Sequence, residues 1–159
     1  MPRDLSKHWD IGVTGAVVHA GKVLYVRRNY EPNKGTWTLP GGYAEHDETL
    51  DEAITREIRE ETGVEVTVQD VIGVRTRHDK AGAVLVIFRA TLVAGTPVAD
   101  GREISDAQFF DAEQITALEP VFPLSRELGL RALHHDARGL VETGIPPSTS
   151  PRWKAFVIG

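Results

Sequence analysis

The sequence predicts one domain of mixed α and β structure, with an α/β (α+β) layered fold around a mixed sheet. Three observations support this: the chain has 159 residues, apolar β-branched runs occur among amphipathic segments, and the two do not follow a strict strand–helix–strand order. A chain of this length buries roughly 70% of its unfolded surface, so it needs no disulfide or structural metal. We expect residues 1–140 to form the domain and residues 141–159 a tail.

The composition excludes several classes of protein. The chain has no cysteine, which rules out disulfides, thiolate metal sites and thiol catalysis. Its 18 basic and 23 acidic residues give a formal net charge of −5, so no general basic surface indicates DNA or RNA. The start of the chain has no apolar signal core, and no run approaches the ~18 apolar residues of a membrane span. A cytoplasmic protein is expected. Because the protein is acidic, it would need a bound cation to bind a polyanion.

The first half of the chain predicts a β-hairpin followed by a loop. Residues 11–19 and 22–28 are apolar and rich in β-branched side chains, with Ala20-Gly21 as the turn between them. The next segment, NYEPNKGTW, has the composition of a loop. Trp37-Thr38-Leu39 is a short extended piece, which Pro40-Gly41-Gly42 ends.

A helix is expected from residue 49 to residue 62. Thr49-Leu50-Asp51-Glu52 fits the capping box of a helix N-terminus, and Gly63 lies where a left-handed C-terminal cap is expected.

The second half of the chain has further strand and helix patterns. Two apolar, β-branched segments flank the turn HDKAG, and a short strand and two helices follow them. The expected strands are residues 64–76, 83–93 and 107–110, and the expected helices are residues 111–118 and 124–134.

Past His135 the composition becomes rich in Pro and Ser. We expect this tail to be irregular until Trp153–Ile158, which could dock or pair as an edge strand. The tail suits a linker or a dimer arm better than a catalytic element, and a homodimer is one expected assembly.

The last turns of the helix at 49–62 carry an unusual number of carboxylates. The stretch REIREETG, residues 56–63, places Glu at a helix end where the macrodipole favours cations. On a wheel of about 100° per residue, Glu57 and Glu61 fall within about 20° of Leu50, in the middle of the apolar stripe. Glu60 falls on the edge of that stripe. The helix therefore ends with a carboxylate cluster on its core face.

A solvated acidic helix end is the simpler explanation, with weak ion pairs such as Arg56–Glu60 worth about 0.2–0.5 kcal/mol. A solvated helix end does not explain why Glu57 and Glu61 lie on the apolar face. Arg56 and Arg59 are expected to point away from these two glutamates and so not to neutralise them. Like charges at i and i+4 need a neutralising partner when they are partly buried. Hard oxygen ligands at this spacing suit Mg²⁺ or Mn²⁺, and we favour a metal site over a structural explanation.

The residues in and around this helix follow a pattern with fixed spacing: Gly42, Glu48, Arg56-Glu57-Ile58, Glu60-Glu61 and Gly63-Val64. These residues match every fixed position of the Nudix box, so the chain resembles the Nudix hydrolase family. Residues 37–42, WTLPGG, resemble the usual entry to the box, and residues 103–110, EISDAQFF, resemble the acidic loop and strand that follow it. The resemblance covers roughly residues 10–135.

The resemblance implies a mixed sheet sandwiched between helices. It also implies hydrolysis of a small-molecule nucleotide substrate, a nucleoside diphosphate linked to another group, with Mg²⁺ or Mn²⁺ as cofactor. By position, Glu57 and Glu61 would be metal ligands, with Glu60 a further ligand and the carbonyl of Gly41 completing the set. Arg56 would hold the glutamates in orientation.

The resemblance also implies roles for residues outside the ligand set. Glu48 would close the loop onto the helix. The general base differs between members of the family, so it could be Glu57 or an acid from the later loop, Glu103 or Asp106. We favour Glu103, which could also bind the metal.

Three residues are candidates for substrate contact. Arg27 and Arg28 end the second strand, where the family often uses an arginine against the nucleotide, although a solvated charge pair on an edge strand fits equally well. Trp37 could stack on a base or pack in the core.

Three cationic side chains precede the HDKAG turn. Arg75, Arg77 and His78 could reach phosphates, but we favour plain surface charge for them. Some Nudix subgroups carry a Pro or Tyr marker about fifteen to eighteen residues past the box. These markers are absent here, because that window holds DKAG at residues 79–82. The second half of the chain leans towards ADP-ribose or nucleotide-sugar pyrophosphatases over triphosphate-cleaving members.

Three functions compete at this level. A metal-dependent pyrophosphohydrolase is favoured. A catalytically silent module that senses a nucleotide or recruits a partner would usually lose box glutamates, and all are present here. A structural protein whose acidic helix binds Ca²⁺ or a basic partner does not explain Gly41-Gly42 or the capped helix.

Overall fold

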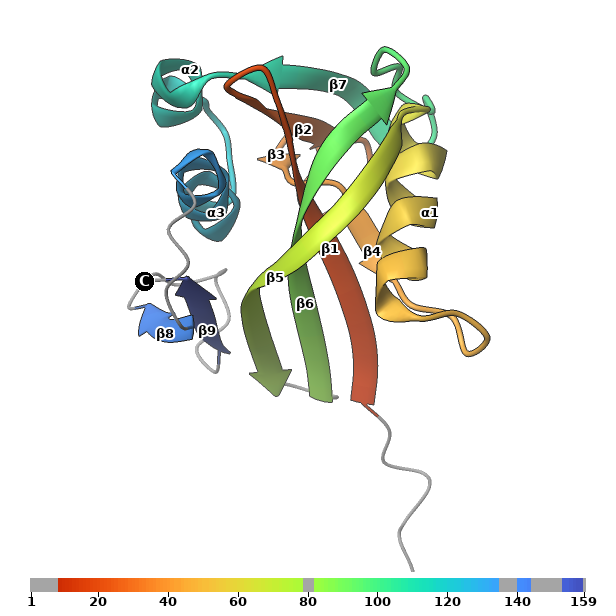
Figure 1. The fold of residues 1–159 in the computed structure, drawn as a ribbon, viewed down its shortest axis with the longest axis vertical. Coiled ribbons are helices and arrows are strands. Elements are labelled where there is room, and N and C mark those ends of the chain that lie inside the picture. The colour runs from red at the N-terminus through yellow and green to blue at the C-terminus, as the bar shows by residue number, and fades with distance from the viewer. Residues whose placement is uncertain (1–8, 79–81, 135–139, 144–152, 159) are drawn as a thin grey trace, which may run out of the picture.

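The computed structural model describes residues 9–78, 82–134, 140–143 and 153–158 (Figure 1). Part of the expected HDKAG turn and much of the expected tail lie outside these residues. The elements in chain order are β1 (Trp9–His19), β2 (Lys22–Arg28), β3 (Trp37–Thr38), β4 (Gly41–Tyr43), α1 (Leu50–Thr62), β5 (Glu65–His78), β6 (Gly82–Ala94), β7 (Ile104–Phe110), α2 (Ala112–Ala117), α3 (Pro123–Leu133), β8 (Leu140–Thr143) and β9 (Trp153–Ile158).

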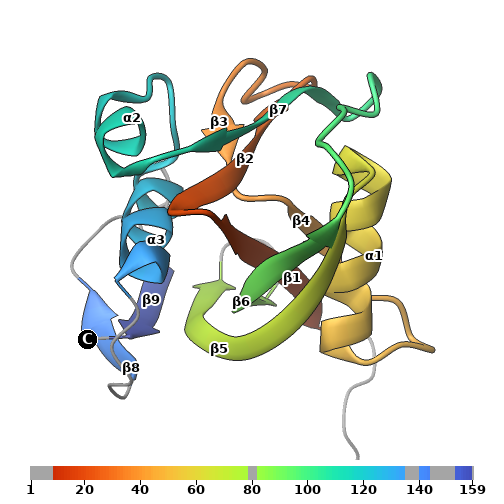
Figure 2. The same cartoon turned by 45° about the horizontal axis from the view of Figure 1, so that its top comes forward.

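The strands form one mixed sheet between two layers of helix. Its order is β3-β2-β1-β6-β5-β9-β8, with β4 and β7 pairing with β1 and β2 off this path. β1 and β6 run parallel, and the other pairs of named strands are antiparallel. Figures 1 and 2 show α1 on one face, with α2 and α3 on the other side. This confirms the mixed sheet between helices that the sequence resemblance implies.

Each face of the sheet buries its own hydrophobic core, because side chains alternate along a strand. Along β2, Leu24 and Val26 join the cluster under α1, which includes Ile54. Val23 and Tyr25 point the other way and join the cluster that contains Leu124, Leu128 and Ala132 of α3. The two cores hold α1 and α3 at fixed positions on opposite sides of the same strands.

The hairpin and the first helix predicted from the sequence are confirmed. β1 and β2 pair antiparallel beside the turn at Ala20-Gly21. The Thr49 amide donates to Glu52 Oε2 at 2.8 Å, which is one half of the expected capping box. Gly63 has φ of 71° and donates to the Arg59 carbonyl at 2.8 Å, so it is the left-handed cap.

The sequence does not predict β4. Pro40-Gly41-Gly42 is expected to end the extended segment, but Gly41–Tyr43 pairs with the first half of β1. The approach is close: Gly41 has φ of 156°, and a Cβ there would lie 2.1 Å from the Val13 carbonyl oxygen. The Thr14 hydroxyl also donates to the Pro40 carbonyl at 2.7 Å. A contact with a distant strand therefore overrides the local signal to stop.

The strand expected at Trp153–Ile158 is present as β9, which pairs antiparallel with β5. It is not the edge of the sheet, because β8 pairs with its other side. The division of the chain at residue 140 stays a prediction.

No helix among the described residues is long and apolar enough to cross a membrane.

One close contact fixes α3 against the sheet. The buried Tyr25 hydroxyl donates to the Ser125 carbonyl at 2.7 Å. A Cβ added at Gly129 would lie 2.0 Å from that hydroxyl oxygen and 2.9 Å from the ring carbon that bears it. Tyr25 therefore occupies the space that a larger residue at 129 would need.

We expect Gly129→Ala to destabilise the protein by about 1–3 kcal/mol, because the added methyl overpacks this contact. In an unobstructed helix the same change stabilises by up to about 1 kcal/mol. Tyr25→Phe removes the obstructing oxygen, so the double variant should lose less stability than the sum of the two single variants. Urea unfolding of the four proteins measures this, and strictly additive losses would show that the contact is not the cause.

Candidate active site

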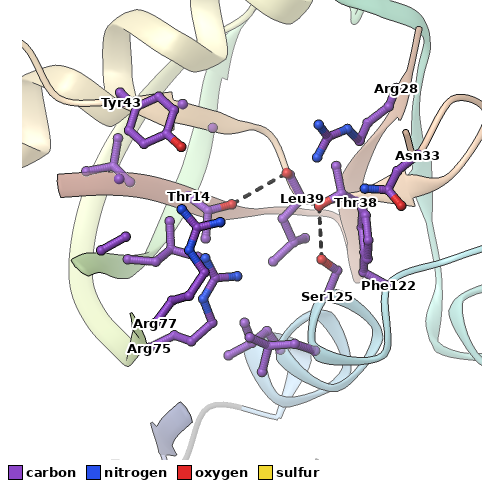
Figure 3. Close-up of a pocket in the computed structure, with 18 of the residues that line it drawn as sticks. Thr14, Arg28, Asn33, Thr38, Leu39, Tyr43, Arg75, Arg77, Phe122 and Ser125 are labelled. Carbon is purple, nitrogen blue, oxygen red and sulfur yellow. Dashed lines mark hydrogen bonds between the residues drawn. The ribbon is translucent and has the colours of Figure 1, made fainter. Parts of the chain in front are cut away.

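A cavity of about 810 Å³ lies beside the Gly41-Gly42 segment, between the sheet and the first turn of α3 (Figure 3). Its wall includes Glu61 from α1, Arg28 from the end of β2, and Arg75 and Arg77 from β5. A volume of this size suits a small organic ligand. The cavity therefore brings together a carboxylate and several cationic side chains.

Glu61 is the buried carboxylate of this site, with 7% of its surface exposed. The Gly41 amide donates to its Oε2 at 3.0 Å. Burial raises the pKa of Glu61 to about 8, against the lowering effect of that hydrogen bond, and the charges of Glu57, Glu103 and Asp100 raise it further. The wheel therefore placed Glu61 correctly on the core face.

Glu57 lies one turn earlier and packs against Gly42. A Cβ at Gly42 would lie 2.4 Å from the Glu57 carboxyl carbon, so a larger residue at 42 would displace this carboxylate. Burial also raises the pKa of Glu57, although the Arg56 guanidinium opposes the shift. The two adjacent glycines thus meet the two core-facing carboxylates.

The expectation that Arg56 points away from these carboxylates is wrong. Its guanidinium donates to Glu57 at 2.9 Å and to Glu60 at 3.3 Å, and it forms a two-pronged pair with Glu48 at 2.6 and 2.9 Å. It also reaches the Tyr43 carbonyl at 3.1 Å. A long arginine side chain extends well beyond the wheel direction of its Cα, which explains the error. The hydrogen bonds that Glu48 accepts from Arg56 and from the Glu45 amide lower the pKa of Glu48 to about 2.

The later acidic loop approaches the same carboxylates. Asp100 holds this loop by accepting hydrogen bonds from the amides of Arg102, Glu103 and Ile104, at 2.9, 3.3 and 2.9 Å. The Asp100 amide in turn donates to the Glu61 carbonyl at 3.2 Å, which ties the loop to the end of α1. Glu103 is exposed on this loop, and its charge acts on both Glu57 and Glu61.

The sequence prediction overlooks Asp100. Its signal is the Asp-Gly pair at 100–101, since an Asp before Gly often accepts hydrogen bonds from the amides of its own turn. Asp106 has a different setting, on β7 opposite Arg27, where it accepts a hydrogen bond from Gln108 at 2.8 Å.

The carboxylate oxygens of these glutamates suit a hard divalent cation, but the carboxylates are not closely grouped in this structure. Within residues 9–78, 82–134, 140–143 and 153–158, no three acidic or histidine side chains are grouped closely enough to hold a metal ion. Glu60, with 57% of its side chain exposed, lies at the margin of the cluster. The charges of the neighbouring carboxylates further raise the pKa of the buried Glu61. A bound cation would relieve the repulsion between these carboxylates, so Glu61 is a suitable ligand for it.

Of the three predicted substrate contacts, only Arg28 lines the cavity. Its guanidinium lies 4.1 Å from the centre of the Tyr30 ring and 5.8 Å from that of Phe122. Arg27 is exposed and donates to the Gly35 carbonyl at 3.0 Å. Trp37 is 7% exposed and packs edge-on against Phe110 with ring centres 5.1 Å apart. The structure places Trp37 in the core.

The prediction of plain surface charge is wrong for Arg75 and Arg77. Both are half-buried on the cavity wall, and Figure 3 shows their guanidinium groups turned into the cavity. Burial lowers the pKa of Arg75 to about 10, and the charge of Arg77 adds to that effect. His78 is exposed, with its ring centre 6.2 Å from that of Trp9.

Known proteins resemble this chain in both sequence and fold. The family model of the NUDIX domain matches residues 10–131. An ADP-ribose pyrophosphatase from Methanocaldococcus jannaschii is 36% identical over 123 residues, which cover 73% of each chain. A NAD-capped RNA hydrolase from Vibrio atlanticus is 33% identical over 71% of this chain, which spans only 41% of that protein.

Solved structures agree with the sequence relatives. A NUDIX hydrolase from Nitrosomonas europaea superposes with a TM-score of 0.71 and 26% identity, over 80% of this chain and 72% of that one. A MutT protein from Methanosarcina mazei superposes with a TM-score of 0.64 and 28% identity, over 81% and 96%. The match over residues 10–131, the relatives and the shared fold give one result: the chain belongs to the Nudix family of pyrophosphohydrolases.

Proposed function

We propose that this protein uses Mg²⁺ or Mn²⁺ to hydrolyse the pyrophosphate bond of a nucleoside diphosphate linked to another group. The observation that carries this proposal is the pair of core-facing carboxylates, Glu57 and Glu61, set against Gly41-Gly42 at a cavity. Substrates of the ADP-ribose or nucleotide-sugar type are favoured over nucleoside triphosphates. The relative named as an ADP-ribose pyrophosphatase supports that choice.

The residues that would hold the cation are Glu57 and Glu61, with Glu60, Glu103 and the carbonyl of Gly41. When bound, such an ion neutralises the pyrophosphate, polarises its P–O bonds and lowers the pKa of the attacking water. It also supplies the positive charge that an acidic protein needs to admit a polyanion.

Side chains of the protein would orient the metal ligands, accept the proton of the attacking water and contact the substrate. Arg56 orients Glu57 and Glu60 through direct hydrogen bonds. Glu103, on the loop that Asp100 anchors to α1, would accept the proton of the attacking water. Arg28 lies on the cavity wall with its Nε buried and without a hydrogen-bond partner among the described residues. We assign substrate contact to Arg28 and leave Arg27 and Trp37 out of the site.

A catalytically silent binding module is the competing proposal, and release of product separates the two. The protein should release nucleoside monophosphate from ADP-ribose or a nucleotide sugar when Mg²⁺ is present, and not in EDTA. Glu57→Gln and Glu61→Gln should each reduce turnover by roughly 10²–10⁴, since each removes a positioned carboxylate. Nucleotide binding without any product, across a panel of dinucleotides and nucleotide sugars, would favour the binding module.

The raised pKa of Glu61 predicts a pH-dependent cost in stability. Above the ordinary carboxyl pKa of 4.5 and below about 8, the folded protein keeps a proton that the unfolded chain has released, so stability falls as pH rises through this window. In EDTA, Glu61→Gln should therefore stabilise the protein more at pH 8 than at pH 5, by at least ~1 kcal/mol.

Urea unfolding in EDTA at the two pH values measures this difference. Glu60→Gln is the matched control, because it removes the same charge from an exposed side chain of the same helix. An equal gain in stability from Glu61→Gln at both pH values would contradict the assignment of the raised pKa to Glu61.

The general base can be located by comparing two acids of the later loop and strand. We expect Glu103→Gln to reduce the rate at least about tenfold more than Asp106→Asn, a difference of ~1.4 kcal/mol in barrier. If Glu103 is the base, the loss lies in kcat with KM nearly unchanged, and if it is only a metal ligand, added Mn²⁺ recovers part of the activity. A larger effect of Asp106→Asn would transfer the role to Asp106, and no effect of either would transfer it to Glu57.

A further inference from the structure

The loop between β6 and β7 brings Glu103 towards the carboxylates of α1. Figures 1 and 2 show this loop beside the C-terminal end of α1, where the Asp100 amide donates to the Glu61 carbonyl at 3.2 Å. The charge of Glu103 raises the pKa of both Glu57 and Glu61. Repulsion between these like charges favours movement of the loop away from α1. The approach of Glu103 therefore depends on contacts elsewhere along the loop.

Asn29, the residue after β2, contacts this loop through both its backbone and its side chain. Its backbone amide donates to the Glu103 carbonyl at 2.8 Å. Its side-chain amide donates to the Arg102 carbonyl at 3.1 Å and to the Gly101 carbonyl at 3.5 Å. Because both partners of the side chain are carbonyl oxygens, the NH₂ group and not the amide oxygen must face the loop. Asn29 thus contacts three consecutive residues of the loop.

A β-bulge lies next to this contact. Ser105 of β7 lies between the strand partners of Arg27 and Arg28 and has no partner of its own on β2. The Ser105 hydroxyl donates to the Arg27 carbonyl at 3.2 Å. A bulge bends its strand and changes the direction of nearby side chains. The backbone bond from Asn29 to Glu103 follows directly after the bulge, so the two features together set the course of the loop.

The segment that carries Asn29 is itself well held. The amide of the preceding residue, Arg28, donates to the Thr36 carbonyl at 3.1 Å, and the Arg28 carbonyl accepts from the Gly35 amide at 2.8 Å. The Arg28 side chain lines the cavity, whereas Asn29 does not. Two consecutive residues thus face the proposed substrate site and the acidic loop.

We propose that Asn29 is a positioning residue for the hydrolysis: it fastens the loop and so keeps Glu103 facing Glu57 and Glu61. This inference rests on the proposed function for the role of Glu103 as the general base. Asn29 acts through the loop and not through contact with the substrate. A displaced base slows the chemical step and leaves the affinity for the substrate nearly unchanged.

The first experiment measures kcat and KM for whichever of ADP-ribose and a nucleotide sugar the wild type cleaves faster. Asn29→Ala should lower kcat at least about fivefold and change KM less than about twofold, because it removes the side-chain contacts and keeps the backbone bond. Asn29→Asp has the same size but places an acceptor against two carbonyls, so it should lower kcat further. Gln114→Ala, which removes a side-chain amide contact with the Asp111 amide at the start of α2, is the matched control and should leave both constants unchanged.

A double-variant cycle tests whether Asn29 acts through Glu103. In the Glu103→Gln background, Asn29→Ala should lower kcat by less than about twofold, because no base remains to be positioned. Equal fold-losses in the two backgrounds would overturn the proposal, and so would a wild-type kcat in Asn29→Asp. A loss in Gln114→Ala as large as that in Asn29→Ala would assign the effect to general stability and overturn it as well.

The second experiment needs no catalysis. The amides of Arg102 and Ile104 donate to Asp100 when the loop is in place, so their hydrogen exchange, followed by NMR in EDTA, measures opening of the loop. Asn29→Ala should accelerate this exchange at least about fivefold, and Gln114→Ala should not change it. Unchanged exchange in Asn29→Ala would show that the Asn29 side chain does not hold the loop.

Failure of this inference and failure of the proposed function give different results. Cleavage by Asn29→Ala at the wild-type rate would overturn the positioning role and leave the pyrophosphohydrolase intact. No cleavage of any substrate by the wild type would count against the proposed function, while hydrogen exchange would still decide whether Asn29 holds the loop.

Discussion

The hydrogen bond from the Gly41 amide to the buried Glu61 carboxylate is the contact on which the site depends. It joins the last turn of α1 to the strand that the two glycines make possible, and it holds a carboxylate where burial disfavours its charge. The helix could bury an apolar side chain at this position at no electrostatic cost. Keeping Glu there costs stability, which is common where a protein holds a group for chemistry and not for packing.

Arg56 pairs with the other carboxylates of the cluster from the solvent side, and does not contact Glu61. One guanidinium contacts Glu48, Glu57 and Glu60 and thereby connects the loop before α1 to the acidic face of the helix. Glu61 has no such cationic partner among its described contacts, and it is the carboxylate whose pKa rises to about 8. The cluster is thus graded from ion-paired carboxylates near the surface to a buried one whose pKa is raised.

Local patterns predicted most of the fold and the core-facing position of Glu61. The hairpin, the capped helix and the burial of Glu61 follow from alternation, capping residues and helical period, which depend only on nearby sequence. The strand β4 and the partners of Asp100 depend on contacts between distant segments. For Arg75 and Arg77, alternation places both side chains on one face. That this face lines a cavity depends on where α3 packs, which the sequence of β5 does not contain.

The pairing of β9 with β5 has a consequence for the reach of the cavity. Residues 153–157 hydrogen-bond along the segment of β5 that carries Arg75 and Arg77, opposite Ala155 and Trp153. The C-terminal strand is therefore a backbone support for one wall of the cavity, although it lies far along the chain from the Nudix box.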